Sequence, residues 1–345
     1  MIHVKFPGKL FLMGEYAIME PGQKAVIAAI DRFLNVYIEA AEQFEVNSRY
    51  GQLQGTEIFM QNGTLTHVKA AIEISRLASR NFRKITMTPF KMHIESELDS
   101  ENEQKYGFGS SGVVLAAVID AILRLHEVEL ESLEFFKLSV MAQVIVGEIS
   151  SGGDLASTCF GGTLVYQRYD ESWLIVADMC NMNLVHSTWP GLLIEPLPST
   201  NLNLCVGWTG TVNQTSPFVD AVRELKSSNP AYYASFLEEA NLRVNQFIDA
   251  WKDHDFILVS QAIDHYRMLM AELGNRASIN IETNVLTKLI ESAHNIGLPA
   301  KISGSGGGDC GFALISENFN EKANTLVHEW EKHGILYLDV GVYKT

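Results

Sequence analysis

Residues 105–112 read KYGFGSSG, and the apolar run VVLAAVIDAILRLHE follows at 113–127. The N-terminus of a helix carries unpaired N–H groups and a partial positive charge, so a glycine-rich turn in front of a helix can bind an anion. The familiar phosphate loop ends in a lysine and a hydroxyl residue, whereas Lys105 precedes the glycines here. The stretch therefore predicts a helix over 112–126 that begins with either an anion site or a plain helix cap.

Length and composition are those of a globular protein with more than one domain. The chain has 345 residues, of which 47% are hydrophobic and 19% are charged, and this length suggests two domains. A net charge of −15 without a basic stripe argues against nucleic acid as a partner. Residues 1–19 lack the features of a signal peptide, and Asp120 interrupts the longest apolar run, so we expect a cytoplasmic protein without a membrane span.

Hydrophobic periodicity predicts an α+β fold with sheets in both halves of the chain. The expected strands lie at residues 2–6, 10–13, 25–30, 33–40, 89–96, 203–208 and 311–315. The expected helices lie at residues 66–80, 112–126, 130–147, 216–227, 230–252, 254–272, 282–296 and 320–333. Pro7-Gly8 and Asp31-Arg32 are expected as turns between strands. The proline-rich segment 189–198 is expected as an extended connection between domains.

Two further segments are rich in glycine. SSGGDLAS at 150–157 is predicted to be a turn, and its Asp154 would ordinarily serve as a turn former. KISGSGGGDCG at 301–311 contains three consecutive glycines, which cost backbone entropy. They indicate either a flexible turn or a backbone that approaches a ligand or another loop, and Asp309 can simply fix that turn.

These segments, together with PGKLFLMGEYAIMEPG at 7–22, resemble the GHMP kinases. That family of small-molecule kinases includes galactokinase, homoserine kinase, mevalonate kinase and phosphomevalonate kinase. Its three motifs match residues 7–22, 107–112 and 301–311 in the family's order. The resemblance implies a two-domain GHMP kinase fold, with an ATP-binding domain like ribosomal protein S5 domain 2 over residues 1–189. A ferredoxin-like domain over residues 190–345 would complete the substrate cleft.

Other residues narrow the resemblance within the family. Gly14-Glu15-Tyr16, WPGLLIEPL at 189–197 and GWTG at 207–210 look like bacterial phosphomevalonate kinases, whereas mevalonate kinases usually carry GEH in the first motif. This resemblance implies an enzyme that uses ATP to phosphorylate 5-phosphomevalonate to 5-diphosphomevalonate, in the mevalonate route to isoprenoids. Mevalonate kinase or another small-molecule GHMP kinase is the alternative. A monomer and a homodimer are both compatible with the sequence.

The resemblance also assigns the site residues. Lys9 and Asp154 match the catalytic lysine and aspartate. The ATP site would comprise Lys105, Gly107, Gly109, Ser110, Ser111 and Gly112. The acceptor side would comprise Lys9, Glu15, Tyr16, Ser151, Thr215, Ser216, Ser305 and Gly306. Ser111 is expected to hold Mg²⁺, because Gln143 stands where mevalonate kinases usually carry a metal-binding glutamate.

The chemistry of the acceptor suggests different roles for Lys9 and Asp154 in phosphate transfer. A phosphate monoester has a second pKa of about 6, so it is mostly ionised at neutral pH and needs little help from a base. The larger barrier is repulsion between the acceptor phosphate and the γ-phosphate, which the charge of Lys9 can lower. We therefore expect Asp154 mainly to orient Lys9 through a charge pair.

Several alternatives stay open at this point. Lys105 can be a solvated loop lysine, Ser216 can cap the helix that Pro217 starts, and Tyr16 can be an ordinary core residue. A non-enzymatic anion-binding protein on the same fold is the alternative from another functional class. A dinucleotide-binding dehydrogenase is disfavoured, because GFGSSG at 107–112 is not GxGxxG.

Overall fold

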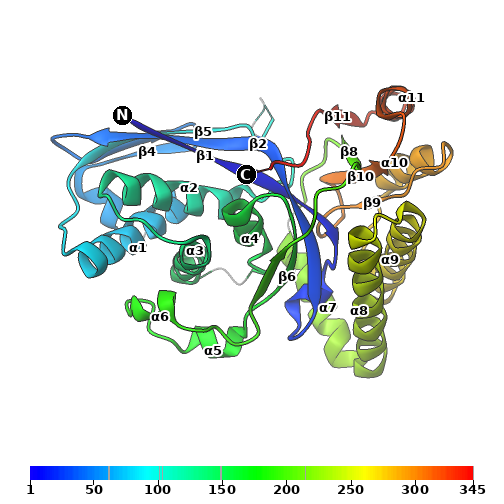
Figure 1. The fold of residues 1–345 in the computed structure, drawn as a ribbon, viewed down its shortest axis with the longest axis horizontal. Helices are drawn as coiled ribbons and strands as arrows, with labels where there is room; N and C mark the ends of the chain where they lie inside the picture. Colours follow the sequence, from blue (N-terminus) through cyan, green and yellow to red (C-terminus); the bar gives the residue numbers. More distant parts are fainter. Residues whose placement is uncertain (61–62, 101, 103, 148–149, 214, 345) are drawn as a thin grey trace.

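The computed structural model describes residues 1–345 with the exception of 61–62, 101, 103, 148–149, 214 and 345. Over the described residues, the chain forms a seven-stranded sheet with helices packed on one face, and then a four-stranded sheet with its own helices (Figure 1). The predicted α+β fold with sheets in both halves is therefore confirmed. None of the described helices is long and apolar enough to cross a membrane.

One long strand, β2 (Lys24–Ala40), organises the first sheet. β1 (Ile2–Met13) runs antiparallel along one edge of β2, and the other edge pairs with β5 (Phe90–Ser96) and β6 (Thr163–Gln167). The sheet is completed by β3 (Glu45–Ser48), β4 (Gly51–Gln54) and β7 (Leu193–Pro196). Alternating burial along β5 shows that one face of this sheet is covered and the other is open.

The predicted turns at Pro7-Gly8 and Asp31-Arg32 do not break the strands. Pro7 pairs with Phe33 and Gly8 pairs with Ile30, so Asp31 and Arg32 form a bulge within one continuous strand. A bulge accommodates extra residues and bends the strand without ending the ladder. The predictions of separate strands at 2–6 and 10–13, and at 25–30 and 33–40, were therefore wrong.

Helices cover the inner face of the first sheet (Figure 1). They are α1 (Thr66–Arg83), α2 (Ser110–Leu125), α3 (Ser132–Val146) and α4 (Gly153–Phe160), with α5 (Glu171–Ile175), α6 (Asn183–His186) and the short 3₁₀ helix η2 (Gly55–Phe59) beside them. A second 3₁₀ helix, η1 (Ala17–Met19), lies against β2. Most residues of α2 are buried, as expected for a helix that is apolar on nearly all sides. The prediction of a turn over 150–157 was wrong for its second half, which forms the start of α4.

The second sheet has the order β11-β8-β10-β9, and all its pairs are antiparallel. Its strands are β8 (Asn203–Trp208), β9 (Ala300–Ile302), β10 (Cys310–Ile315) and β11 (Leu336–Leu338). The helices of this half are α7 (Thr215–Ser228), α8 (Pro230–Lys252), α9 (Phe256–Ala277), α10 (Asn284–His294) and α11 (Phe319–Glu331). Figure 1 shows α7 and α8 standing beside the first half of the chain.

The segment that was expected to connect the domains is extended, but part of it belongs to the first sheet. β7 pairs antiparallel with β6 and forms an edge of that sheet. An edge strand tolerates proline, because one side of the strand makes no ladder hydrogen bonds. The domain boundary between residues 189 and 190 stays a prediction.

Candidate active site

Lys9 joins strand β1 to the glycine-rich stretch in front of α2. Its Nζ donates a 2.7 Å hydrogen bond to the carbonyl oxygen of Gly107. Its backbone N–H donates a 3.0 Å hydrogen bond to the carbonyl oxygen of Phe108. The structure thus brings together the predicted catalytic lysine and the predicted phosphate cradle, residues 107–112, which are far apart in the sequence.

Asp154 lies against the first turn of α2. A Cβ placed on Gly112 would lie 2.2 Å from Asp154 Oδ2, which is far closer than real atoms approach. A Cβ placed on Gly109 would lie 3.1 Å from both Asp154 Cβ and Lys9 Cε. These two glycines are therefore needed so that Lys9 and Asp154 can both reach the start of the helix.

Burial and charge act on Lys9 in opposite directions. Removal of its ammonium group from water lowers the pKa of Lys9 below the ordinary value of 10.5. Asp154 opposes this shift most strongly, followed by Asp309, Cys310 and Glu15. The charged form of Lys9 therefore depends on the anions around it, as the predicted charge pair with Asp154 requires.

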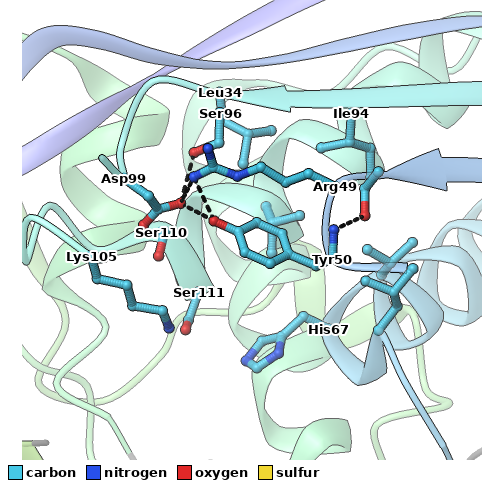
Figure 2. A pocket seen from close by; sticks show the side chains of 14 residues that line it. Leu34, Arg49, Tyr50, His67, Ile94, Ser96, Asp99, Lys105, Ser110 and Ser111 are labelled. Carbon is cyan, nitrogen blue, oxygen red and sulfur yellow. Dashed lines mark hydrogen bonds and ion pairs between the residues drawn. The ribbon is translucent and has the colours of Figure 1, made fainter. Parts of the chain in front are cut away.

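A cavity of about 190 Å³ adjoins the start of α2 (Figure 2). Lys105, Ser110 and Ser111 line one side of it, so the polar end of the cavity is part of the predicted ATP site. Its apolar lining consists of Leu34, Leu65, Val68, Ile94 and Val114. A concave site that combines apolar side chains with a small number of polar groups is typical of a pocket for a small organic ligand.

A hydrogen-bonded cluster of Arg49, Tyr50 and Asp99 lines the same cavity (Figure 2). Arg49 Nη2 donates to Tyr50 Oη at 2.7 Å and to Asp99 Oδ2 at 3.0 Å, and the Tyr50 hydroxyl donates to the same carboxylate oxygen. Burial raises the pKa of Tyr50 to about 12. No sequence motif marks this cluster, because only the parallel pairing of β3 with β5 brings the segments that follow these strands together.

Three residues predicted on the acceptor side meet where the two halves of the chain touch. The Tyr16 hydroxyl donates a 2.6 Å hydrogen bond to the carbonyl oxygen of Ser305. The hydroxyl groups of Thr215 and Ser305 lie 3.3 Å apart.

The other two serines predicted on the acceptor side lie elsewhere. Ser151 lies just before α4, where its hydroxyl accepts a 3.3 Å hydrogen bond from the Gly153 N–H. Ser216 is exposed on the first turn of α7.

The structure places Glu15 differently from the prediction. Its side chain is 3% exposed and forms an ion pair with Lys301, which is 0% exposed. Lys301 Nζ also donates a 2.6 Å hydrogen bond to the carbonyl oxygen of Ile302. A buried ammonium requires a partner, and Glu15 provides it for Lys301. This ion pair connects the first motif to the third motif inside the protein, so the Glu15 carboxylate does not face a cleft.

The third glycine-rich segment packs closely against the backbone of two other loops. A Cβ on Gly306 would lie 2.2 Å from the carbonyl oxygen of Ile281, and a Cβ on Gly308 would lie 2.6 Å from that of Thr211. The Gly306 carbonyl oxygen accepts a 2.7 Å hydrogen bond from Asn213 Nδ2. Close approach to other loops therefore explains these glycines, and Gly306, which was predicted on the acceptor side, is buried.

Comparisons with known proteins identify the family of this chain. Residues 66–162 match the GHMP kinases N terminal domain, and residues 248–335 match the GHMP kinases C terminal domain. The chain belongs to the GHMP kinase family. This GHMP kinase is 31% identical to the phosphomevalonate kinase of Streptomyces sp. (strain CL190), and the match covers 96% of the chain and 94% of that relative.

Solved structures with the same fold include two bacterial proteins. Our GHMP kinase resembles a protein from Listeria innocua with a TM-score of 0.92 and 35% identity, covering 98% of this chain and 96% of that one. It resembles Streptococcus pneumoniae phosphomevalonate kinase, in complex with phosphomevalonate and AMPPNP, with a TM-score of 0.86 and 27% identity over 99% of each chain. The family resemblance and the two-domain GHMP kinase fold, S5 domain 2-like and then ferredoxin-like, are thereby confirmed.

Proposed function

We propose that this GHMP kinase transfers the γ-phosphate of ATP to 5-phosphomevalonate and releases ADP and 5-diphosphomevalonate. The observation that carries the proposal is the meeting of Lys9, Asp154 and the glycine-rich cradle at the N-terminus of α2. The phosphomevalonate kinases among the relatives and solved structures support this choice of acceptor. The fold alone would not support one acceptor over another, because proteins with the same fold catalyse many different reactions.

ATP is proposed to lie along the cavity beside the start of α2. Its phosphates would face the helix N-terminus, which attracts anions, and its base would fill the apolar part of the cavity. Ser110 and Ser111 line the junction between these two parts. Lys105 also lines the cavity (Figure 2), so its ammonium group is available to a phosphate.

Ser111 is proposed as the protein ligand of Mg²⁺. Mg²⁺ takes oxygen ligands, binds few protein groups and keeps several waters and phosphate oxygens, which leaves a place for one serine hydroxyl. Among the described residues, no group of three or more His, Cys, Asp or Glu side chains could hold a metal. Gln143 is buried, and its Oε1 accepts a 2.8 Å hydrogen bond from Ser150. When bound, the ion would neutralise charge on the β- and γ-phosphates.

Lys9 is proposed to lower the repulsion between the two phosphates that react. Its ammonium group is fixed by the Gly107 carbonyl oxygen, and a fixed cation stabilises developing charge without reorganisation. Asp154 is proposed to keep Lys9 charged and oriented. A base has little to do, because the acceptor phosphate, with a second pKa of about 6, is already ionised near neutral pH.

The acceptor is proposed to bind between the two domains, against Tyr16, Ser151, Thr215, Ser216 and Ser305. Hydroxyl groups of Thr215 and Ser305 lie near each other and belong to the C-terminal half, whereas Tyr16 and Ser151 belong to the N-terminal half. Hydrogen bonds from hydroxyl groups to an ionised phosphate are stronger than those to neutral acceptors. The acceptor would thus contact both domains at once.

A coupled assay of ADP release tests the proposed function. 5-Phosphomevalonate and mevalonate are supplied side by side with ATP, and we expect a far higher kcat/KM for 5-phosphomevalonate. A preference for mevalonate would overturn the choice of acceptor. Lys9→Met serves as the control for contaminating kinases, because it should lose ADP release with both compounds while its circular dichroism spectrum stays unchanged.

A further inference from the structure

Asp309 is a carboxylate at the edge of the phosphate cradle to which the proposed reaction gives no role. Its backbone is left-handed, with φ of 53°. Its N–H donates 2.7 Å to the carbonyl oxygen of Thr211, and its own carbonyl oxygen accepts 3.0 Å from the Thr209 N–H. Its Oδ1 accepts a 3.3 Å hydrogen bond from the Asn213 N–H. The C-terminal half of the chain therefore fixes this side chain in place.

The second carboxylate oxygen of Asp309 faces the cradle. A Cβ placed on Gly107 would lie 3.0 Å from Asp309 Oδ2, so only glycine allows this approach. Gly107 is also the residue whose carbonyl oxygen accepts the hydrogen bond from Lys9. Beside this contact, the Cys310 thiol donates a 3.1 Å hydrogen bond to the carbonyl oxygen of Tyr106. Asp309 and Lys9 thus reach the same glycine from different halves of the chain.

A negative charge beside a phosphate site is unfavourable unless cations balance it. Burial raises the pKa of Asp309, while the Asn213 N–H and the charges of Lys9 and Lys105 act to lower it. In return, Asp309 is second only to Asp154 among the groups that raise the pKa of Lys9. Cys310 and Glu15 are the remaining titratable groups that face Lys9, and burial keeps the Cys310 thiol neutral because it raises the pKa of that thiol.

We propose that Asp309 is a positioning residue whose negative charge holds the ammonium group of Lys9 at the phosphate cradle. The cradle then has two carboxylates near Lys9, Asp154 from the N-terminal domain and Asp309 from the C-terminal domain. Contact with the C-terminal domain would therefore complete the charge balance of the cradle. The expected change in kcat rests on the proposed function, whereas the expected change in the pKa of Lys9 does not.

Asp309→Asn is the variant that isolates the charge. Asparagine tolerates the left-handed backbone region and can still accept the hydrogen bond from the Asn213 N–H. Asp309→Glu retains the charge and serves as the conservative variant. Asp255→Asn is the matched control, because Asp255 also accepts a backbone hydrogen bond, from the Leu258 N–H, at the start of α9. Urea unfolding of all variants shows whether each is folded.

The first measurement needs no substrate. The proteins are acetylated competitively with acetic anhydride over a range of pH, and the labelling of Lys9 is quantified by mass spectrometry. We expect the pKa of Lys9 to fall by about 1 unit in Asp309→Asn, the lower end of the effect of an adjacent opposite charge. In Asp309→Glu, the pKa of Lys9 should stay close to its value in the unchanged protein. An unchanged Lys9 profile in folded Asp309→Asn, or an equal shift in Asp255→Asn, would overturn the proposal.

The second measurement separates positioning from metal binding. We expect the alkaline limb of kcat in Asp309→Asn to move to lower pH, so that kcat on that limb falls roughly tenfold, and we expect the affinity for Mn²⁺–ATP, measured by electron paramagnetic resonance, to stay unchanged. A weaker Mn²⁺ affinity with an unchanged Lys9 profile would make Asp309 a metal ligand and reject the proposal. If 5-phosphomevalonate is not a substrate at all, the proposed function fails, yet the acetylation result still decides the role of Asp309.

Discussion

Lys9 keeps its charge in a place where burial opposes it, and this balance determines the expected pH dependence. Below about pH 6 the acceptor phosphate gains a proton and becomes a poorer nucleophile, so kcat should fall on the acid side. On the alkaline side Lys9 loses its proton, and because its pKa is lowered from 10.5, this loss should begin below the pH expected for a free lysine. A pH–rate profile at constant ionic strength measures both limbs.

The control for the alkaline limb is Lys9→Arg, since arginine stays protonated throughout the accessible range. Its kcat should be lower than that of the unchanged enzyme, yet the alkaline limb should disappear. If Lys9→Arg retains the same alkaline limb, then a group other than Lys9 titrates there, and the electrostatic role of Lys9 would have to be abandoned.

Substitution of each member of the Lys9–Asp154 pair tests which residue acts directly on the phosphates. We expect Lys9→Met to lower kcat by roughly 100- to 1,000-fold, the range for loss of one group that stabilises transition-state charge. Asp154→Asn should cost less, because it only weakens the orientation and charge of Lys9. The opposite order, together with loss of the limb on which kcat rises with pH in Asp154→Asn, would instead show that Asp154 is a base. Steady-state kinetics with saturating ATP provides both values.

At the scale of elements, the first turn of α2 is adapted to Asp154 and not to helix formation. Glycine to alanine within a helix normally stabilises it by about 1 kcal/mol. At position 112 the added methyl group would overlap Asp154, since Cβ would lie 2.2 Å from Oδ2. We therefore expect Gly112→Ala to lower the free energy of unfolding by about 1–3 kcal/mol, the cost of overpacking. Urea unfolding provides the measurement.

A double-mutant cycle supplies the control for this substitution. In the background of Asp154→Ala the obstructing carboxylate is gone, so Gly112→Ala should become neutral or stabilising by up to about 1 kcal/mol. An equal destabilisation in both backgrounds would mean that Asp154 is not the reason for glycine at this position, and that some other part of the helix start excludes a side chain.

Periodicity predicted the elements whose burial follows from their own residues, such as β5 and α2. It could not predict β2 as one strand, because Asp31-Arg32 reads as a turn until β1 continues the ladder past it. Nor could it predict that Gly153 starts a short helix. Lys9 and Asp154 were found through motifs; their contact with the cradle required the structure.

Contacts between residues that are distant in the sequence are the part of the site that could not be predicted from the sequence. The partner of Glu15 is Lys301, 286 positions away, and no local pattern connects them. The Arg49–Tyr50–Asp99 cluster combines a turn between two strands with a loop after a third strand, so it is defined only once β3 lies beside β5. Such contacts depend on topology, which local periodicity does not specify.

At the scale of the whole molecule, the buried pair of Glu15 and Lys301 links the two domains. Lys301→Met should lower the free energy of unfolding by about 3–5 kcal/mol, because it leaves the Glu15 carboxylate buried without its cation. Glu15→Gln combined with Lys301→Met should recover much of that loss. Chemical denaturation followed by tryptophan fluorescence measures both variants.

An exposed ion pair in the same half of the chain provides the comparison. Lys288 and Glu291 on α10 lie 2.7 Å apart, with side chains 52% and 49% exposed. Lys288→Met should change the free energy of unfolding by less than about 1 kcal/mol. If Lys288→Met and Lys301→Met were equally destabilising, the link between the domains would not depend on burial of the ion pair.

The edge of β2 between its pairings with β5 and β6 is completed by the segment 339–343. Ile30 forms a bridge with Val342, and the Tyr343 N–H donates 2.9 Å to the carbonyl oxygen of Ala29. This segment is synthesised about 300 residues after β2, which at roughly 5–20 residues per second means roughly 15–60 s later. For that interval the nascent sheet carries an unpaired edge, a template for pairing with the wrong chain. On a ribosome that stalls before residue 339, Lys9 would therefore already lie in its strand while this edge of the sheet is still unpaired.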